Sequence, residues 1–357
     1  MPPPPPFGNN FPLGGPRTQV GSGTGFGQPQ ANVRGFGGGV AETSLLFAST
    51  VSGIAGQRMI MSDDGGDTWQ FVAALPSNPI TGQLAFDSIR QRLCSVAGPA
   101  GSIVANNAFF SDDYGASWTQ SNKPSGARLG GTVFVPSAGG GAGEIWGVRF
   151  GVAGIERSAD GGATWTANAG PADSTGKATD ALDDKGNAYF TVTSGFAVRS
   201  PNGIAEFLAI GVNGPVRDVE YCAGFGVSGL VLGSADTTIQ TSPDGGFGTA
   251  FTTRSAIAAG SPTFAYSLSR NECVCISSND QRNSTDGINW ADPGLHPANF
   301  FAADALYSEI WGRYIFVGRT AANASAVHTS EDGINWTSRY APLTNAGPIS
   351  YIVEAVL

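Results

Sequence analysis

A short turn-like segment recurs seven times along the chain, and its spacing constrains the fold more than any other feature. The clearest copies begin at Ser62, Ser111 and Ser158 and read SDDGGDTW, SDDYGASW and SADGGATW. The serines that begin successive copies are 42 to 49 residues apart. A repeat of forty-odd residues that holds several short strands is typical of the blades of a β-propeller. The sequence therefore predicts an all-β fold, a seven-bladed β-propeller.

The other four copies depart from this pattern in two ways. The fourth and fifth, from Ser200 and Ser242, are degenerate and end near a phenylalanine instead of a tryptophan. The sixth and seventh, from Ser284 and Ser330, are one residue shorter and read STDGINW and SEDGINW. The residues that we assign to the repeated turn are Ser62, Asp64, Gly66, Trp69, Ser111, Asp113, Gly115, Trp118, Ser158, Asp160, Gly162, Trp165, Ser242, Asp244, Ser284, Asp286, Trp290, Ser330, Asp332 and Trp336.

The residue types of this segment suit a tight turn between two strands. Its aspartate can accept backbone N–H bonds within the turn, as in Asx turns. Gly66, Gly115 and Gly162 stand where we expect a positive φ, which glycine adopts without strain. The tryptophan begins the next strand, where its ring buries roughly 150–250 Å². We assign no metal ligand here, because the first copy lacks the regular spacing and the distal glutamate of a calcium loop.

Short alternating runs around each copy predict four antiparallel strands in each blade. In the second repeat these runs cover residues 83–87, 93–97, 108–111 and 117–120, and in the fifth they cover 216–223, 229–233, 238–241 and 249–253. Helical periodicity is absent. The pattern therefore favours seven sheets of four strands.

The first repeat lacks an innermost strand, and the C-terminus supplies one. The first copy is preceded by two strand-like runs, 44–50 and 58–62, and followed by a third, 68–73. The run 349–356 is left over after the seventh copy. We expect it to pair with the N-terminal strands and complete the first blade, which closes the ring and hides two sheet edges.

The pattern S-x-D-x-G-x-T-W resembles the Asp box (BNR repeat), known from sialidases, other secreted carbohydrate-active proteins and many bacteriophage proteins. The resemblance covers residues 41–357 and includes seven spaced copies. It implies that each box is the hairpin between the third and fourth strands of a blade. It also implies that the boxes lie on the rim away from the binding face, so their role is structural.

Residues 1–40 differ from the repeats and form a separate region, an extended Pro/Gly-rich arm. Five consecutive prolines follow Met1, many glycines come after them, and no acidic residue occurs before Glu42. Such a composition predicts a short polyproline II segment followed by coil. We interpret the arm as a docking segment for a partner, with Phe7, Phe11, Arg17, Phe26, Arg34 and Phe36 as its anchors. The alternative interpretation is a disordered leader or linker.

Composition and charge exclude several classes of protein. The formal net charge is −9, and the three lysines, Lys123, Lys177 and Lys185, form no cluster, so we expect no nucleic-acid partner. No apolar run approaches the roughly 18 residues of a membrane span. The N-terminus lacks the basic and apolar regions of a secretory signal peptide.

The cysteines and histidines indicate neither a metal site nor a disulfide framework. Two histidines, His296 and His328, are present. The cysteines form no C-x-x-C pair, and we interpret them as small buried apolar residues with free thiols. They are Cys94, Cys222, Cys273 and Cys275. We therefore expect no cofactor.

We find no catalytic residues in the sequence. A sialidase-like enzyme would need an arginine cluster, a Tyr–Glu nucleophile pair and an Arg-Ile-Pro motif before the first box, and none of the arginines there (Arg17, Arg34, Arg58) is followed by Ile-Pro. A two-carboxylate glycosidase would need paired acids in one cleft. The candidate acids are scattered without visible pairing, and we interpret them as solvated loop residues: Asp173, Asp236, Asp280 and Asp292.

These features favour a non-enzymatic structural or interaction protein. The short boxes resemble those of phage tail-associated proteins. We expect a bacteriophage virion component (tail, neck or capsid surface), assembled in the host cytoplasm without a signal peptide and held in a multi-subunit particle by other virion proteins through residues 1–40. One alternative is a carbohydrate-binding adhesin that stacks a host-surface glycan on exposed aromatic residues such as Tyr114, Phe300, Phe301 or Tyr340. Another alternative is a glycoside hydrolase with a diverged site.

Overall fold

The fold is seen in a computed structural model of the chain. It describes residues 43–50, 59–72, 81–97, 108–123, 129–136, 138–149, 154–168, 178–182, 188–192, 196–200, 208–210, 218–226, 230–235, 237–243, 251–258, 260, 262–278, 280–294, 296–297, 299–339 and 347–357. The arm predicted over residues 1–40, with its six candidate anchors, lies outside the described residues.

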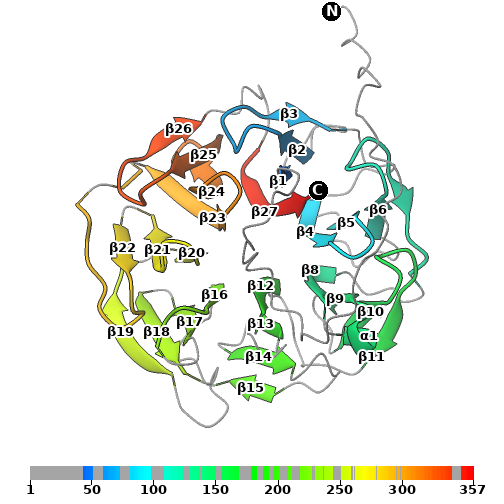
Figure 1. The fold of residues 1–357 in the computed structure, drawn as a ribbon, viewed down its shortest axis with the longest axis horizontal. Helices are drawn as coiled ribbons and strands as arrows, with labels where there is room; N and C mark the ends of the chain where they lie inside the picture. Colours follow the sequence, from blue (N-terminus) through cyan, green and yellow to red (C-terminus); the bar gives the residue numbers. More distant parts are fainter. Residues whose placement is uncertain are drawn as a thin grey trace, which may run out of the picture.

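The described strands form seven antiparallel sheets, which stand as blades around a central axis (Figure 1). From the axis outward, blades 1 to 3 hold β27 (Ile349–Val356), β1 (Ser44–Thr50), β2 (Met59–Ser62) and β3 (Gln70–Phe71); β4 (Thr81–Asp87), β5 (Arg92–Ala97), β6 (Ala108–Ser111) and β7 (Thr119–Gln120); and β8 (Leu129–Val135), β9 (Glu144–Arg149), β10 (Ile155–Ser158) and β11 (Thr166–Asn168). The predicted β-propeller is confirmed.

Blades 4 to 7 continue the series around the axis. They hold β12 (Ala178–Leu182), β13 (Ala188–Val192), β14 (Phe196–Ser200) and β15 (Leu208–Ile210); β16 (Asp218–Cys222), β17 (Leu230–Ala235), β18 (Thr238–Ser242) and β19 (Thr252–Ala256); β20 (Thr263–Ser267), β21 (Glu272–Ser277) and β22 (Asp280–Ser284); and β23 (Phe300–Ser308), β24 (Arg313–Thr320), β25 (Ser325–Ser330) and β26 (Thr337–Arg339).

The C-terminal strand closes the ring, as the sequence predicts. Strand β27 pairs antiparallel with β1 along its whole length, with Val356 opposite Ser44. Beyond the strands, the N–H of Leu357 donates to the carbonyl of Thr43 at 2.9 Å. The carboxylate of Glu354 on β27 accepts hydrogen bonds of 2.5 Å from the hydroxyls of Ser44 and Ser308, which belong to blades 1 and 7. Closure therefore joins the first and last described strands, β1 and β27, and the two blades that flank the seam.

Blade 6 differs from the predicted set of four strands. It has three strands, and its fourth is reduced to one isolated bridge between Asn283 and Ala291. Both backbone bonds of that bridge measure 2.9 Å. Pro293 follows two residues later, and because proline has no N–H it cannot extend the ladder.

Two local features also depart from the expected pattern. Strand β19 runs over Thr252–Ala256, later than the predicted 249–253, and Phe251 before it is buried in the place of a box tryptophan. The segment α1 (Ala138–Gly141) between β8 and β9 contains Gly139 and Gly140 at φ 61° and 71°, so it is a left-handed turn of glycines. This is consistent with the absence of helical periodicity.

The hydrophobic core lies between neighbouring blades. Leu46 and Ile60 of blade 1 pack in one cluster with Ile315 and Val327 of blade 7. A second cluster joins blades 1 and 2, and a third joins blades 5 and 6. The four cysteines are buried and free, which confirms their interpretation as core residues. Burial raises the pKa of the Cys222 thiol to about 11. Among the described residues, no helix is long and apolar enough to span a membrane.

Candidate functional site

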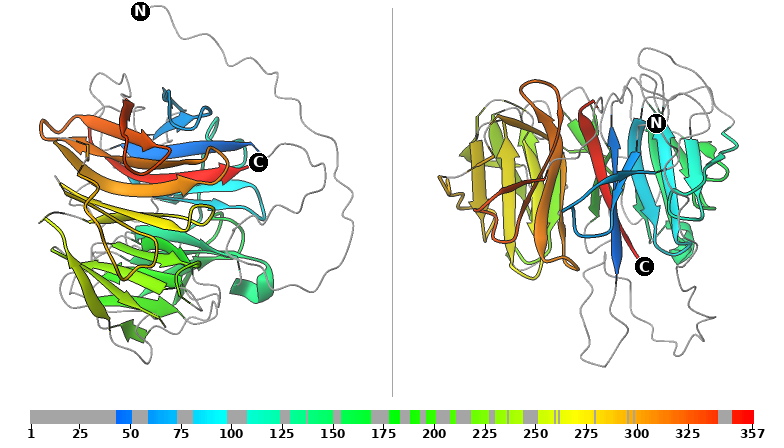
Figure 2. Two further views of the ribbon diagram at one scale, coloured as in Figure 1. Left: turned by 60° about the vertical axis from the view of Figure 1, so that its left-hand side comes forward. Right: turned by 90° about the horizontal axis from the view of Figure 1, so that it is seen from above.

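The two rims of the propeller carry different turns. Because neighbouring strands are antiparallel, the turns between first and second strands and between third and fourth strands open on one rim, which we call the box rim. The loops between second and third strands, and those between blades, open on the opposite rim. Figure 2 shows the C-terminus and α1 on the same side of the propeller, the box rim.

The three long boxes are held by one serine and one aspartate. In blade 1 the Ser62 hydroxyl donates to Asp64 Oδ1 at 2.8 Å and accepts the N–H of Gly66 at 2.8 Å. Asp64 in turn accepts the N–H of Thr68 at 2.9 Å and its hydroxyl at 2.6 Å. Blades 2 and 3 repeat these contacts. The φ angles of Gly66, Gly115 and Gly162 are 91°, 85° and 94°, as predicted.

The two short boxes form an equivalent turn that is held by an asparagine. Asp286 accepts the N–H of Asn289 on Oδ1 and its side-chain amide on Oδ2, both at 2.7 Å, and Asp332 does the same with Asn335. Burial opposes ionisation of Asp286, but the hydrogen bonds from Asn289 prevail and lower its pKa to about 2. These carboxylates are acceptors within turns, so they are not placed to act as acids at neutral pH.

The box tryptophans differ in how their indole N–H is used. In Trp69, Trp165 and Trp290 it donates to the carbonyl of the box glycine at 3.0 Å. The indole N–H of Trp118 is buried and has no partner. Trp336 donates instead to the side chain of Gln281 in blade 6, at 2.9 Å. Two residues of the degenerate box in blade 5 were also assigned. Ser242 ends β18 and is buried, whereas Asp244 lies outside the described residues.

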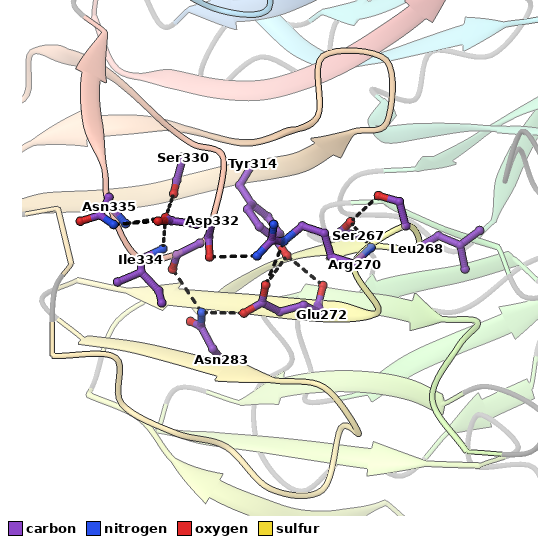
Figure 3. Close-up of polar contacts among 12 residues, drawn as sticks. Ser267, Leu268, Arg270, Glu272, Asn283, Tyr314, Ser330, Asp332, Ile334 and Asn335 are labelled. Carbon is purple, nitrogen blue, oxygen red and sulfur yellow. Dashed lines mark hydrogen bonds and ion pairs between the residues drawn. The ribbon is translucent and has the colours of Figure 1, made fainter.

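Three of the five described boxes, those of blades 1, 3 and 7, also contact the preceding blade through an arginine. Arg92 donates to Asp112 in its own box and to the carbonyl of Asp160 in the next, each at 2.6 Å. Arg313 of blade 7 likewise donates to Asp67 in the box of blade 1 at 2.6 Å. Arg270 donates to Glu272 at 3.2 Å and to the carbonyl of Asp332 in the next box at 3.4 Å (Figure 3). The rim thus carries a belt of contacts that joins blades 2 and 3, blades 6 and 7, and blades 7 and 1.

These arginines lie at a second repeated turn that the sequence analysis missed. It joins the first and second strands, and a polar side chain at the end of the first strand accepts an N–H three residues on: Asp87 from Arg90, Ser267 from Arg270, and Ser308 from Trp311, at 3.0 to 3.1 Å. The residue one position before the second strand has positive φ: Gln91, Asn271 and Gly312. The recurring Asp or Ser followed by Gln, Asn or Gly is the signal that would have identified this turn.

The innermost strands are joined around the axis by a third set of contacts. A polar side chain on one inner strand accepts the N–H of an inner-strand residue in the next blade. These pairs are Gln83 with Thr132 at 3.2 Å, Asp218 with Phe264 at 2.9 Å, and Asp304 with Ile352 at 3.0 Å. Each acceptor stands four residues before the end of its strand. Such bonds satisfy N–H groups that face the axis with no further strand to pair with.

One buried ionic cluster lies between blades 2 and 3. Lys123 contacts Glu156 Oε1 at 3.0 Å, and Arg149 donates to the same oxygen at 3.3 Å. The side chains of Lys123 and Glu156 are 2% and 0% exposed. Burial lowers the pKa of Lys123, although the Glu156 charge opposes this shift. A perturbed lysine is often a sign of function, but this one is closed off from any substrate, so we interpret the cluster as structural.

Two of the scattered candidate acids meet in blade 6, which corrects the view that none is paired. Asp280 and Asp292 both contact Nη1 of Arg282, the latter at 3.4 Å. Asp280 also accepts the N–H of Ala258 at 2.8 Å. Arg282 therefore forms ion pairs with both carboxylates. Asp173 and Asp236 lie outside the described residues. Among those described, no group of three or more His, Cys, Asp or Glu side chains could hold a metal ion.

The candidate sugar-stacking residues differ in how far their side chains are exposed. Phe300 is 1% exposed and packs edge-on against His328, so its assignment as an exposed aromatic was wrong. Its neighbour Phe301 is half-buried on the opposite rim, where the Arg319 guanidinium lies 4.7 Å from its ring centroid. Tyr114 is half-buried on the box rim and donates to Gln91 at 3.1 Å. Tyr340 lies outside the described residues.

Comparisons with known proteins identify the fold alone. No model of a known protein family matches the chain, and no curated protein matches it. A structure of YCF48 bound to a D1 peptide is similar with a TM-score of 0.51 at 17% identity, covering 74% of this chain and 82% of that one. YCF48 from Cyanidioschyzon merolae gives 0.51 at 14%, covering 76% and 88%. A catalytically inactive virginiamycin B lyase from Staphylococcus aureus, with quinupristin, gives 0.57 at 14%, covering 78% and 93%.

Proposed function

We propose that this protein is a non-enzymatic structural and interaction protein, a component of a bacteriophage virion that is attached to other virion proteins through residues 1–40. The observation that carries the proposal is the belt of contacts on the box rim. Arg92, Arg270 and Arg313 each join two positions of the rim, and the box carboxylates hold the turns themselves. These polar side chains hold the turns and the blades rigidly in place, which suits a scaffold that presents its surface in a particle.

The state of the described carboxylates also supports a scaffold over a hydrolase. A glycosidase needs one acid that carries a proton at working pH and a second, ionised acid nearby. Asp280 and Asp292 are both paired with Arg282. Glu156 is bound by Lys123 and Arg149 and has no access to solvent. None of these groups is placed to deliver a proton to a glycosidic oxygen.

Sedimentation of the native source material tests the proposal. We expect the chain, identified by mass spectrometry, to co-sediment with a particle through a high-salt wash. Deletion of residues 1–40 should abolish incorporation while leaving the propeller folded, with a cooperative melting transition, because the seam is closed by β27 and β1. Recovery of the full chain as free protein alone would overturn the virion assignment. Incorporation of the truncated chain at the normal level would overturn the role of the arm.

One observation favours a second candidate function, carbohydrate binding by the opposite rim. Phe301 presents part of its ring there, and Arg319 beside it donates to Asn323. An aromatic face with neighbouring amide and guanidinium donors is a common arrangement for a sugar ring.

A glycan array, probed with the wild-type protein and the F301A variant, tests this second candidate. Loss of a bound glycan in F301A would support it. The matched control is F110A, because Phe110 has an arginine over its ring at 4.4 Å but lies in blade 2, beside a box. No binding by the wild-type protein, or equal loss in both variants, would contradict it.

A further inference from the structure

The exposed large apolar side chains gather on one rim. Among the described residues there are four: Ile89, Ile288, Ile334 and Leu357, at 51%, 47%, 38% and 38% exposed. Ile89 lies in the turn between β4 and β5, Ile288 and Ile334 lie in the short boxes, and Leu357 follows β27. All four positions belong to the box rim. Three of them, Leu357, Ile334 and Ile288, lie in the successive blades 1, 7 and 6.

The fold does not require isoleucine at these box positions. The residue two before the box tryptophan is Asp67, Ala116 or Ala163 in the long boxes, and Ile288 or Ile334 in the short ones. In the short boxes the turn uses the backbone N–H of the isoleucine, which donates to the box aspartate at 2.8 and 2.9 Å. Any residue but proline supplies that N–H. Figure 3 shows Ile334 at the edge of the polar network, joined to it through its backbone.

The charge around these isoleucines is acidic. Asp63, Glu309 and Glu331 are exposed on the box rim, and Glu331 lies next to the box aspartate of blade 7. The arginines of the rim are already bound to carboxylates and carbonyls: Arg313 contacts Asp67 and Glu331, and Arg270 contacts Glu272. The rim therefore carries exposed carboxylates as well as exposed apolar side chains, which suits a partner that is apolar and basic.

The chain itself carries a segment of that chemistry, attached at this rim. Residues 1–40 hold phenylalanines and the two arginines Arg17 and Arg34, and no acidic residue occurs before Glu42. The described chain begins at Thr43, whose carbonyl is bonded to the N–H of Leu357. A coil of this length spans roughly 35 Å between its ends, and intramolecular attachment gives an effective concentration of about millimolar.

We propose that residues 1–40 dock on the box rim of their own propeller, along the row formed by Leu357, Ile334 and Ile288. Phenylalanines of the segment cover the isoleucines, and its arginines lie against the exposed acids. The inference concerns the isolated protein and does not depend on the virion assignment. A virion neighbour that takes the same segment must displace it from the rim, so docking would also limit association before assembly.

Limited proteolysis of the full-length protein tests the docking. Trypsin cleaves after Arg17 and Arg34, and we expect the double variant I288S/I334S to be cut there about tenfold faster than wild type, since cleavage follows the population of the released segment. The matched control is I89S, which removes an exposed isoleucine in blade 2, on the other side of blade 1 from Ile334 and Ile288. Melting temperatures of all three proteins establish that the propeller remains folded.

The outcomes separate docking in the same molecule from the other arrangements. Faster cleavage in I288S/I334S but not in I89S, independent of protein concentration, is the expected result. Equal cleavage rates in all three proteins would overturn the proposal. Protection that grows with protein concentration would also overturn it, in favour of docking on a second copy. Failure here leaves incorporation into a particle to be decided by sedimentation, so the two proposals fail independently.

Discussion

The long boxes of blades 1 to 3 and the short boxes of blades 6 and 7 build the same turn from different side chains. In the long copies a hydroxyl residue four positions after the aspartate supplies both an N–H and an O–H, as Thr68 does for Asp64. In the short copies an asparagine three positions after it supplies an N–H and an amide, as Asn289 does for Asp286. The box therefore depends on a carboxylate with both oxygens bound, and its length is secondary.

The two kinds of box also differ in how they meet the preceding blade. In the long box of blade 3, a Cβ added at Gly162 would lie 2.8 Å from the sulfur of Cys94, and in the short box of blade 7 a Cβ added at Gly333 would lie 2.9 Å from Val274. In the short box of blade 7 the carbonyl of Gly333 accepts the side chains of Gln281 and Asn283 at 2.5 and 3.1 Å. The short box therefore combines a steric contact with contacts from side-chain amides. We expect the steric contacts to tolerate substitution least, because the backbone there has no room to move.

The largest effect is expected for G162A. A Cβ at this position would lie 2.8 Å from Cys94 Sγ, and the φ of 94° is itself unfavourable for alanine. We expect a loss of about 2–4 kcal/mol in the free energy of unfolding, measured by denaturant titration. The control is G140A, where φ is 71° but nothing lies within 4 Å of the new Cβ; we expect about 1 kcal/mol there. Equal losses in the two variants would show that strain alone matters and that the packing comparison is wrong.

A smaller effect is expected when box tryptophans are replaced by phenylalanine. W165F removes the indole bond to the carbonyl of Gly162, whereas W118F removes a buried N–H that has no partner. Both changes lose similar apolar area. We expect W165F to be more destabilising than W118F by about 1 kcal/mol, because W118F also relieves an unsatisfied donor. Thermal and denaturant unfolding of the two variants measure the difference, and the reverse order would contradict the assigned contacts.

The order and boundaries of many strands followed from the sequence because each depends on local pattern. The predicted run 349–356 is β27 exactly as bounded, and its place in blade 1 followed from counting strands. The missing fourth strand of blade 6 could also have been predicted, because Pro293 interrupts the ladder of hydrogen bonds. The contact of Arg313 with Asp67 was not, because its partners are 246 residues apart and meet across the closed seam. Sequence spacing carries no information on which arginine faces which box.

The candidate site was less predictable than the fold, for a related reason. Exposure decides whether an aromatic or an acid is available, and it depends on neighbouring blades. Phe300 and Phe301 are adjacent in sequence, yet Phe300 is buried against His328 and Phe301 reaches the rim. The pairing of Asp280 and Asp292 through Arg282 could not be predicted, because it depends on how the short outer segment of blade 6 folds. The exposed isoleucines of the short boxes were visible in the sequence, but their exposure was not.

The smallest effect is expected from the pH dependence of a short box. Hydrogen bonds from Asn289 lower the folded-state pKa of Asp286 to about 2, well below that of an unfolded aspartate. Its contribution to stability is therefore present above the unfolded pKa and is lost as the pH falls from about 4 to 2. Because the group is near solvent, we expect about 1 kcal/mol after screening. The variant D286N should show a flatter unfolding free energy than wild type across that pH range, measured by urea titration. The long-box variant D113N is the comparison, since hydrogen bonds from Ser117 also lower the pKa of Asp113 despite its burial. If D286N and wild type lose stability in parallel between pH 4 and 2, the carboxylate is not held by Asn289 as described, and the equivalence of long and short boxes fails.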